Sequence, residues 1–169
     1  MPYYPWFEEA KNEVLEQGDI LENFIIPTPR REDPTEIELS EWDLIIMTQS
    51  CDLMNDKISH VICCPVFDLE YYSEEIDPNM KKKDVRNKII KGMHFHMHMI
   101  NKCEMDGLKR DFRLVNLARV IEIQKESIVE FVEKNSPRLR LMPPYREHLA
   151  QAFARSFMRV GLPEDIPRF

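Results

Sequence analysis

Three histidines stand at alternate positions along one short segment of the chain. His94, His96 and His98 would share one face of a strand, because successive side chains of a strand point to opposite faces. Two histidines in this arrangement bind zinc when a third ligand converges, and Cys51 or Cys103 could supply it. The sequence offers no closed set of cysteines and histidines. We therefore expect a solvent-facing strand surface, with no metal and no other cofactor.

A run of small polar residues, 48–53, follows an apolar segment. Cys51 would become a nucleophile if a histidine such as His98 approached its thiol. The alternative is a turn in which Ser50 and Asp52 cap backbone groups. The sequence thus defines a possible functional cluster of Ser50, Cys51, Asp52 and His98.

The carboxy-terminal part of the chain is rich in arginine. Six arginines and three acids give residues 136–169 a net charge of +3, against −10 for residues 1–135. Arginine favours bidentate recognition of carboxylate or phosphate. These side chains could contact a partner that is acidic at the contact, or pair with the chain's own acids. The candidate partner-binding residues are Arg138, Arg140, Arg146, Arg155 and Arg159.

Apolar periodicity predicts the elements that must position these residues. Alternating or continuous apolar runs predict strands, and apolar residues three and four apart predict helices. We expect a mainly β fold with helices, built as a small bent antiparallel sheet or barrel with a terminal helix packed on it. The expected strands are 20–26, 43–48, 58–67, 93–100 and one or two in 112–123; the expected helices are 7–16, 84–91, 127–133 and 144–160.

Residues 70–91 form the longest stretch without a predicted strand in the first two thirds of the chain. The stretch runs from acidic residues to Lys81, Lys82 and Lys83, with few large apolar side chains before the short helix. Long loops of this kind are usually functional or disordered. We expect a mobile insertion that is protease-sensitive at the three lysines.

Length and charge limit the class of protein. The chain of 169 residues is expected to form one domain, and its net charge of −7 argues against a general role in nucleic-acid binding. No apolar run is long enough to span a membrane, and the amino terminus lacks the pattern of a secretory signal. These features favour a cytoplasmic protein.

Three segments resemble the opening of the MazF/PemK-like toxins, which begin with a Gly-Asp-Ile strand in a small SH3-like barrel. The segments are 17–21, 43–47 and 59–66, and the resemblance covers residues 20–70, with a looser match over 93–123. The Thr-Gln-Ser-Cys-Asp-Leu motif at 48–53 and the tail 144–155 also look like an uncharacterised group of bacterial and phage proteins. The resemblance implies a barrel domain over 1–135 and an Arg-rich helical extension over 136–169.

The catalytic positions of that family look lost. Its ribonucleases carry an arginine entering the second strand and a threonine or serine after the third, whereas this chain has Glu41-Trp42-Asp43 and Phe67. The resemblance therefore implies a non-catalytic regulator that binds a protein partner in toxin-antitoxin-like, phage-defence or CRISPR-associated signalling. Such a regulator could sequester a sigma-like transcription factor and release it on proteolysis within 70–91.

Two other functions and one assembly state stay open at this point. A divergent endoribonuclease would use substitute groups from Ser50, Cys51, His98, Arg140 and Arg146. A metal enzyme would use the histidine strand. A homodimer is also compatible with the sequence.

Overall fold

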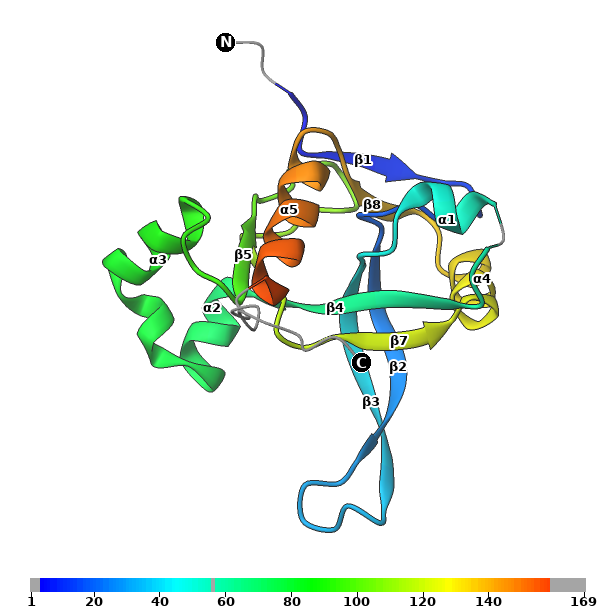
Figure 1. Ribbon diagram of the computed structural model, residues 1–169, viewed down its shortest axis with the longest axis horizontal. Helices are drawn as coiled ribbons and strands as arrows, with labels where there is room; N and C mark the ends of the chain where they lie inside the picture. Colours follow the sequence, from blue (N-terminus) through cyan, green and yellow to red (C-terminus); the bar gives the residue numbers. More distant parts are fainter. Residues whose placement is uncertain (1–3, 56, 159–169) are drawn as a thin grey trace, which may run out of the picture.

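The computed structural model describes residues 4–55 and 57–158, and its elements are labelled in Figure 1. The strands are β1 (Phe7–Ala10), β2 (Ile20–Pro29), β3 (Ile37–Ile46), β4 (His60–Asp68), β5 (Met97–Ile100), β6 (Arg113–Asn116), β7 (Ile121–Gln124) and β8 (Arg138–Leu141). The helical elements are α1 (Ser50–Met54), α2 (Leu69–Tyr71), the π-helical turn η1 (Tyr72–Ile76), the 3₁₀ turn η2 (Pro78–Lys81), α3 (Lys83–Ile90), α4 (Lys125–Lys134) and α5 (Tyr145–Phe157).

An antiparallel meander of β2, β3 and β4 forms the centre of the molecule. The sheet order is β2-β3-β4-β6-β5, and β7 pairs with the first half of β4. Residues 44–46 are buried on both faces of the sheet, which explains why this strand is continuously apolar and does not alternate. The predicted pairing of the strands at 43–48 and 58–67 is confirmed, with Ile45 opposite Cys64.

The sheet does not close into a barrel. Strands β1 and β8 form a separate two-stranded sheet, and among the described strands no ladder joins β5 back to β2. The expectation of a β-rich fold with antiparallel strands and helices is confirmed as a mixed α/β fold.

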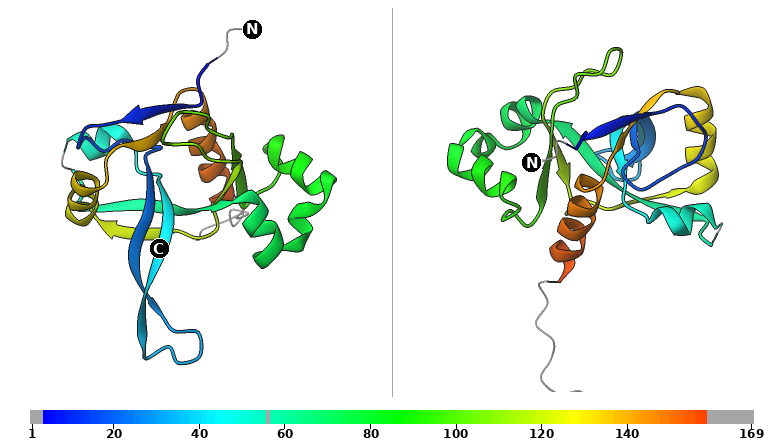
Figure 2. Two further views of the ribbon diagram at one scale, coloured as in Figure 1. Left: turned by 180° about the vertical axis from the view of Figure 1, so that it is seen from behind. Right: turned by 90° about the horizontal axis from the view of Figure 1, so that it is seen from above.

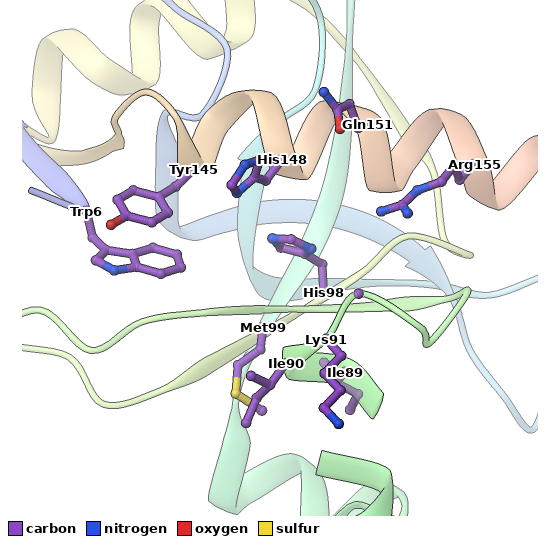
Figure 3. A pocket seen from close by; sticks show the side chains of 11 residues that line it. Trp6, Ile89, Ile90, Lys91, His98, Met99, Tyr145, His148, Gln151 and Arg155 are labelled. Atoms are coloured by element: carbon purple, nitrogen blue, oxygen red, sulfur yellow. The ribbon is translucent and has the colours of Figure 1, made fainter. Parts of the chain in front are cut away.

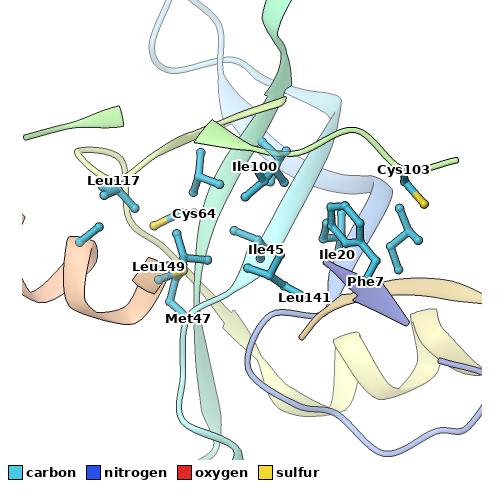
Figure 4. Packing of buried hydrophobic residues seen from close by; sticks show 14 of the residues in the cluster. Phe7, Ile20, Ile45, Met47, Cys64, Ile100, Cys103, Leu117, Leu141 and Leu149 are labelled. Atoms are coloured by element: carbon cyan, nitrogen blue, oxygen red, sulfur yellow. The ribbon is translucent and has the colours of Figure 1, made fainter. Parts of the chain in front are cut away.

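Two apolar clusters hold the sheet between helices. On one face, Ile20, Ile45 and Leu141 pack with Leu149 and Ala152 of α5, as Figure 4 shows for part of this cluster. On the other face, Leu44 and Ile46 lie in a cluster with Ile128 and Val132 of α4. The predicted apolar stripe of the terminal helix therefore docks α5 on the sheet. No described helix is both long enough and apolar enough to cross a membrane.

The helix predicted for residues 7–16 is wrong. Phe7–Ala10 is strand β1, which pairs with β8 so that Phe7 lies opposite Leu141. Phe7 and Ala10 are both buried by this pairing. A tertiary partner from the far end of the sequence thus overrides the local helical pattern, and residues 136–169 contribute a strand as well as a helix.

Residues 70–91 are helical and packed, which corrects the expectation of a loop with little to bury. The chain passes through α2, η1, η2 and α3, on one side of the molecule in Figures 1 and 2. Tyr72, Met80 and Ile89 are buried there against Met97 and Leu114 of the sheet. The helix predicted for 84–91 is confirmed as α3. The protease sensitivity of Lys81, Lys82 and Lys83, which are exposed, stays a prediction.

Candidate functional site

The three histidines do not share a strand face. Only His98 lies in β5; His94 and His96 precede it. The Nδ1 atom of His94 accepts hydrogen bonds from the backbone N–H groups of His96 (3.3 Å) and Met97 (3.1 Å), so this ring shapes the entry into β5. Within the described residues, no group of three His, Cys, Asp or Glu side chains could hold a metal ion.

The polar run at 48–53 holds backbone segments together. The Ser50 hydroxyl accepts a hydrogen bond from the Gln17 backbone N–H (3.1 Å), which ties α1 to the turn before β2. The Cys51 thiol is exposed, and its hydrogen-bonding neighbours are Gln49 and Asp52 rather than a histidine. The possible cluster of Ser50, Cys51, Asp52 and His98 is therefore not brought together as a nucleophilic site.

Arg138 and Arg140 are buried and engaged inside the chain. Both guanidinium groups donate to the carboxylate of Asp19, which is fully buried, with Nε to oxygen distances of 3.0 Å and 2.5 Å. Both also donate to the Val14 carbonyl oxygen. These two arginines are thus not part of a partner surface, contrary to the expectation, and sequence charge alone could not show this.

The remaining arginines of the set differ in accessibility. Arg146 pairs with Glu16 and Glu147, at 3.3 Å in each case. Arg155 is exposed on α5. Arg159 lies outside the described residues.

A pocket of about 310 Å³ lies between α5, β5 and the end of α3. In Figure 3 the ring of His98 points toward α5, where His148, Gln151 and Arg155 line the opposite wall. Lys91 also lines the pocket, and none of the described lining residues is Asp or Glu. The pocket therefore presents hydrogen-bond donors and positive charge on a molecule that is acidic as a whole.

Aromatic and apolar side chains form the rest of this pocket. Trp6 and Tyr145 stack with ring centroids 3.6 Å apart and planes 9° from parallel. Tyr145 in turn meets the His148 ring edge-on at 6.3 Å. Ile90 and Met99 line the wall near His98. Trp6 was not identified from the sequence, because no spacing rule links the amino terminus to α5.

The environment of His98 keeps its imidazole neutral. Burial, followed by the nearby His148 and Arg155, lowers the pKa of His98 to about 4. A neutral imidazole has one N–H donor and one acceptor nitrogen. At neutral pH, His98 can therefore donate one hydrogen bond into the pocket without carrying charge.

The adjacent buried thiols of Cys63 and Cys64 offer no second site. Burial raises the pKa of Cys64 to about 12 and raises the pKa of Cys63 further. Because the thiolate is the reactive form, both side chains act as small core residues, as the adjacent pair in an apolar run had suggested.

A long hairpin projects from the body of the molecule (Figures 1 and 2). We call residues 24–42, the outer parts of β2 and β3 with their turn, the β2–β3 arm. The register places Pro27 opposite Leu39 and Pro29 opposite Ile37. Opposed residues share a face of the sheet. The shared face is exposed and mostly apolar; it consists of Ile25, Pro27, Pro29, Ile37 and Leu39, with Glu41 opposite Ile25 at its inner end.

The segment Glu41-Trp42-Asp43 and Phe67, where the resemblance led us to expect catalytic residues, meet through their aromatic side chains. Trp42 meets Phe67 edge-on with centroids 6.1 Å apart, and the Arg119 guanidinium lies 4.1 Å above the Trp42 ring.

Comparison of the chain with protein-family models, with curated proteins and with solved structures found no match.

Proposed function

We propose that the protein is a non-catalytic cytoplasmic regulator that binds a protein partner through the β2–β3 arm. One observation carries this: Ile25, Ile37 and Leu39 of the arm are 56%, 70% and 75% exposed. A two-stranded hairpin is only marginally stable alone in water, and contiguous exposed apolar surface marks interaction sites. An apolar partner surface would cover this face and hold the arm in place.

The charge of the arm favours a basic partner. Residues 30–41 hold five acids and two arginines. A partner with an apolar patch and a basic rim would be complementary to this surface, and nucleic-acid-binding proteins carry such basic surfaces. A sigma-like transcription factor fits this description. This proposal reverses the partner charge expected from the arginine set, since two of those arginines pair internally.

In this proposal the β2-β3-β4 meander derives from the SH3-like barrel of the MazF/PemK-like toxins. The absence of catalysis is supported by Trp42 and Phe67, whose own side chains have no hydroxyl or guanidinium group, and by the nearby Arg119 guanidinium, which is engaged over the Trp42 ring. Toxin-antitoxin-like or phage-defence signalling is the proposed setting.

A divergent endoribonuclease is the second candidate, favoured by the two imidazoles of His98 and His148 in one pocket. Paired histidines can act as general base and general acid. The substitute groups named from the sequence do not assemble around them, because Arg140 is buried against Asp19 and Ser50 lies on α1.

Purification of the tagged protein from its own cells, followed by binding measurements with each purified partner, tests the regulator. We expect a basic partner whose affinity falls at least tenfold with the double change Ile37→Ser and Leu39→Ser. The stability of the variant should change by less than about 0.5 kcal/mol for each exposed position.

Met54→Ser is the matched control, because Met54 is 63% exposed on α1, away from the arm. It should leave partner binding unchanged. Partner binding that survives the double change in the arm, or a partner with an acidic contact surface, would refute the proposal.

A further inference from the structure

The pocket between α5 and β5 contains donors that the fold does not use. Within residues 4–55 and 57–158, no hydrogen bond or ion pair is found for the side chains of His98, Lys91, His148, Gln151 or Arg155. By contrast, Arg138 and Arg140 are fully engaged with acids inside the chain. Lys91, His148, Gln151 and Arg155 are exposed, so water can satisfy them in the free protein, but the convergence of several donors on one cavity is typical of a ligand site.

The placement of these donors fits a tetrahedral anion better than a planar one. His98 approaches from β5, whereas His148 and Arg155 approach from α5, so these donors face the cavity from two sides. Lys91 lines the cavity at the end of α3, with its amine directed away from α5 in Figure 3. A carboxylate offers two oxygens in one plane, whereas a phosphate monoester offers three oxygens and close to two negative charges. The absence of Asp or Glu from the described lining removes repulsion of such a dianion.

The remaining wall suits an apolar or planar group attached to the phosphate. The Trp6–Tyr145 stack, Ile90 and Met99 extend the pocket away from Arg155. A volume of about 310 Å³ lies in the range of small-molecule sites. We propose that this pocket binds a phosphate monoester with a planar or apolar body, of about mononucleotide size. This ligand site is separate from the β2–β3 arm and does not depend on the proposed partner.

Calorimetric titration with adenosine 5′-monophosphate, adenosine and inorganic phosphate tests the site. We expect the monophosphate to bind more tightly than inorganic phosphate and adenosine not to bind, because the phosphate supplies the contacts with the donors. Arg155→Gln and His148→Gln should each lower the affinity for the monophosphate at least tenfold. In NMR spectra, the ring signals of His98 and His148 should shift on addition of the ligand.

Arg31→Gln is the charge-matched control, because Arg31 is an exposed arginine on the arm, outside the pocket lining. It should leave monophosphate binding unchanged. Absence of binding by the folded wild-type protein, equal binding of adenosine, or equal loss in Arg31→Gln and Arg155→Gln would overturn the proposal. Failure of the arm variants to lose a protein partner would refute the proposed function and leave this result unaffected.

Discussion

At the scale of single residues, Asp19 is the shared acceptor of a buried ion-pair network. Its side chain is fully buried and accepts hydrogen bonds from Arg138, Arg140 and the Glu16 backbone N–H. The network joins the start of β2 to β8. Removal of one member of a buried ion network leaves the others charged and unpaired, which is strongly destabilising.

Asp19→Asn is therefore expected to lower the free energy of unfolding by about 3–5 kcal/mol, measured by urea denaturation. Glu9→Gln serves as the control, because the Glu9–Lys11 pair is exposed. It should cost less than about 1 kcal/mol. A cost below about 1 kcal/mol for Asp19→Asn would show that the buried network contributes little.

His98 predicts a pH dependence of stability. Its pKa falls from the ordinary 6.5 to about 4 in the folded chain. Between these values the unfolded chain binds a proton that the native chain does not, so stability falls as pH decreases. The contribution lost between about pH 7 and pH 5 is up to about 2 kcal/mol.

Unfolding measurements at both pH values should show a smaller loss for His98→Gln than for the wild type. His60→Gln, a change at an exposed histidine of β4, should retain the wild-type slope. Equal slopes for His98→Gln and wild type would contradict the assigned environment of His98.

At the scale of elements, the turn into β2 depends on Gly18. Its φ is +89°, and a Cβ atom there would lie 3.1 Å from both the Cβ atom and the carbonyl oxygen of Leu141 in β8. Left-handed backbone disfavours side chains, and the close approach of two elements adds a steric cost.

Gly18→Ala should therefore destabilise the protein by about 2–4 kcal/mol in thermal or urea unfolding. Gly107→Ala isolates the backbone component, since Gly107 has φ +79° and a Cβ atom added there would meet no atom within 4 Å. Gly107→Ala should lower the free energy of unfolding by about 1 kcal/mol. If the two variants are equally stable, contact with β8 does not determine the conformation at Gly18.

The junction of η2 and α3 is the expected site of first proteolysis. Lys82 links the two elements in an extended conformation, and Lys81, Lys82 and Lys83 are exposed. Limited trypsin digestion should cleave there first and yield two fragments of roughly half the mass each. If trypsin cuts first at Arg30 or Arg31 and leaves 70–91 intact, the idea that cleavage within 70–91 releases the partner is refuted.

At the scale of the whole molecule, charge is divided between regions. The chain carries a net charge of −7, the arm is acidic, and the donors gather in one pocket. A small cationic pocket suits one phosphate group, whereas tight binding of a long nucleic acid needs an extended cationic surface.

We therefore expect no cleavage of cellular RNA by the purified protein in a primer-extension survey. The wild-type protein and a His98→Ala variant should give the same primer-extension products as a reaction without protein. Discrete new cleavage sites that disappear in His98→Ala would instead establish the endoribonuclease.

The sequence alone predicted strands at 20–26, 43–48 and 58–67, the pairing of the last two, and the helices α3, α4 and α5, because their apolar periodicity is local. It did not predict the β2–β3 arm, since β2 continues to Pro29 and β3 already begins at Ile37. It also identified His98 and Arg155 as candidates, although in different sites. The strand at Phe7–Ala10, the burial of Arg138 and Arg140 and the packing of residues 70–91 were decided by tertiary contacts. An arginine has the same local pattern whether its partner is Asp19 or solvent, so burial could not be predicted from composition. The pocket joins Trp6, His98 and His148 from distant parts of the chain, and only the packing of α5 on the sheet brings them together.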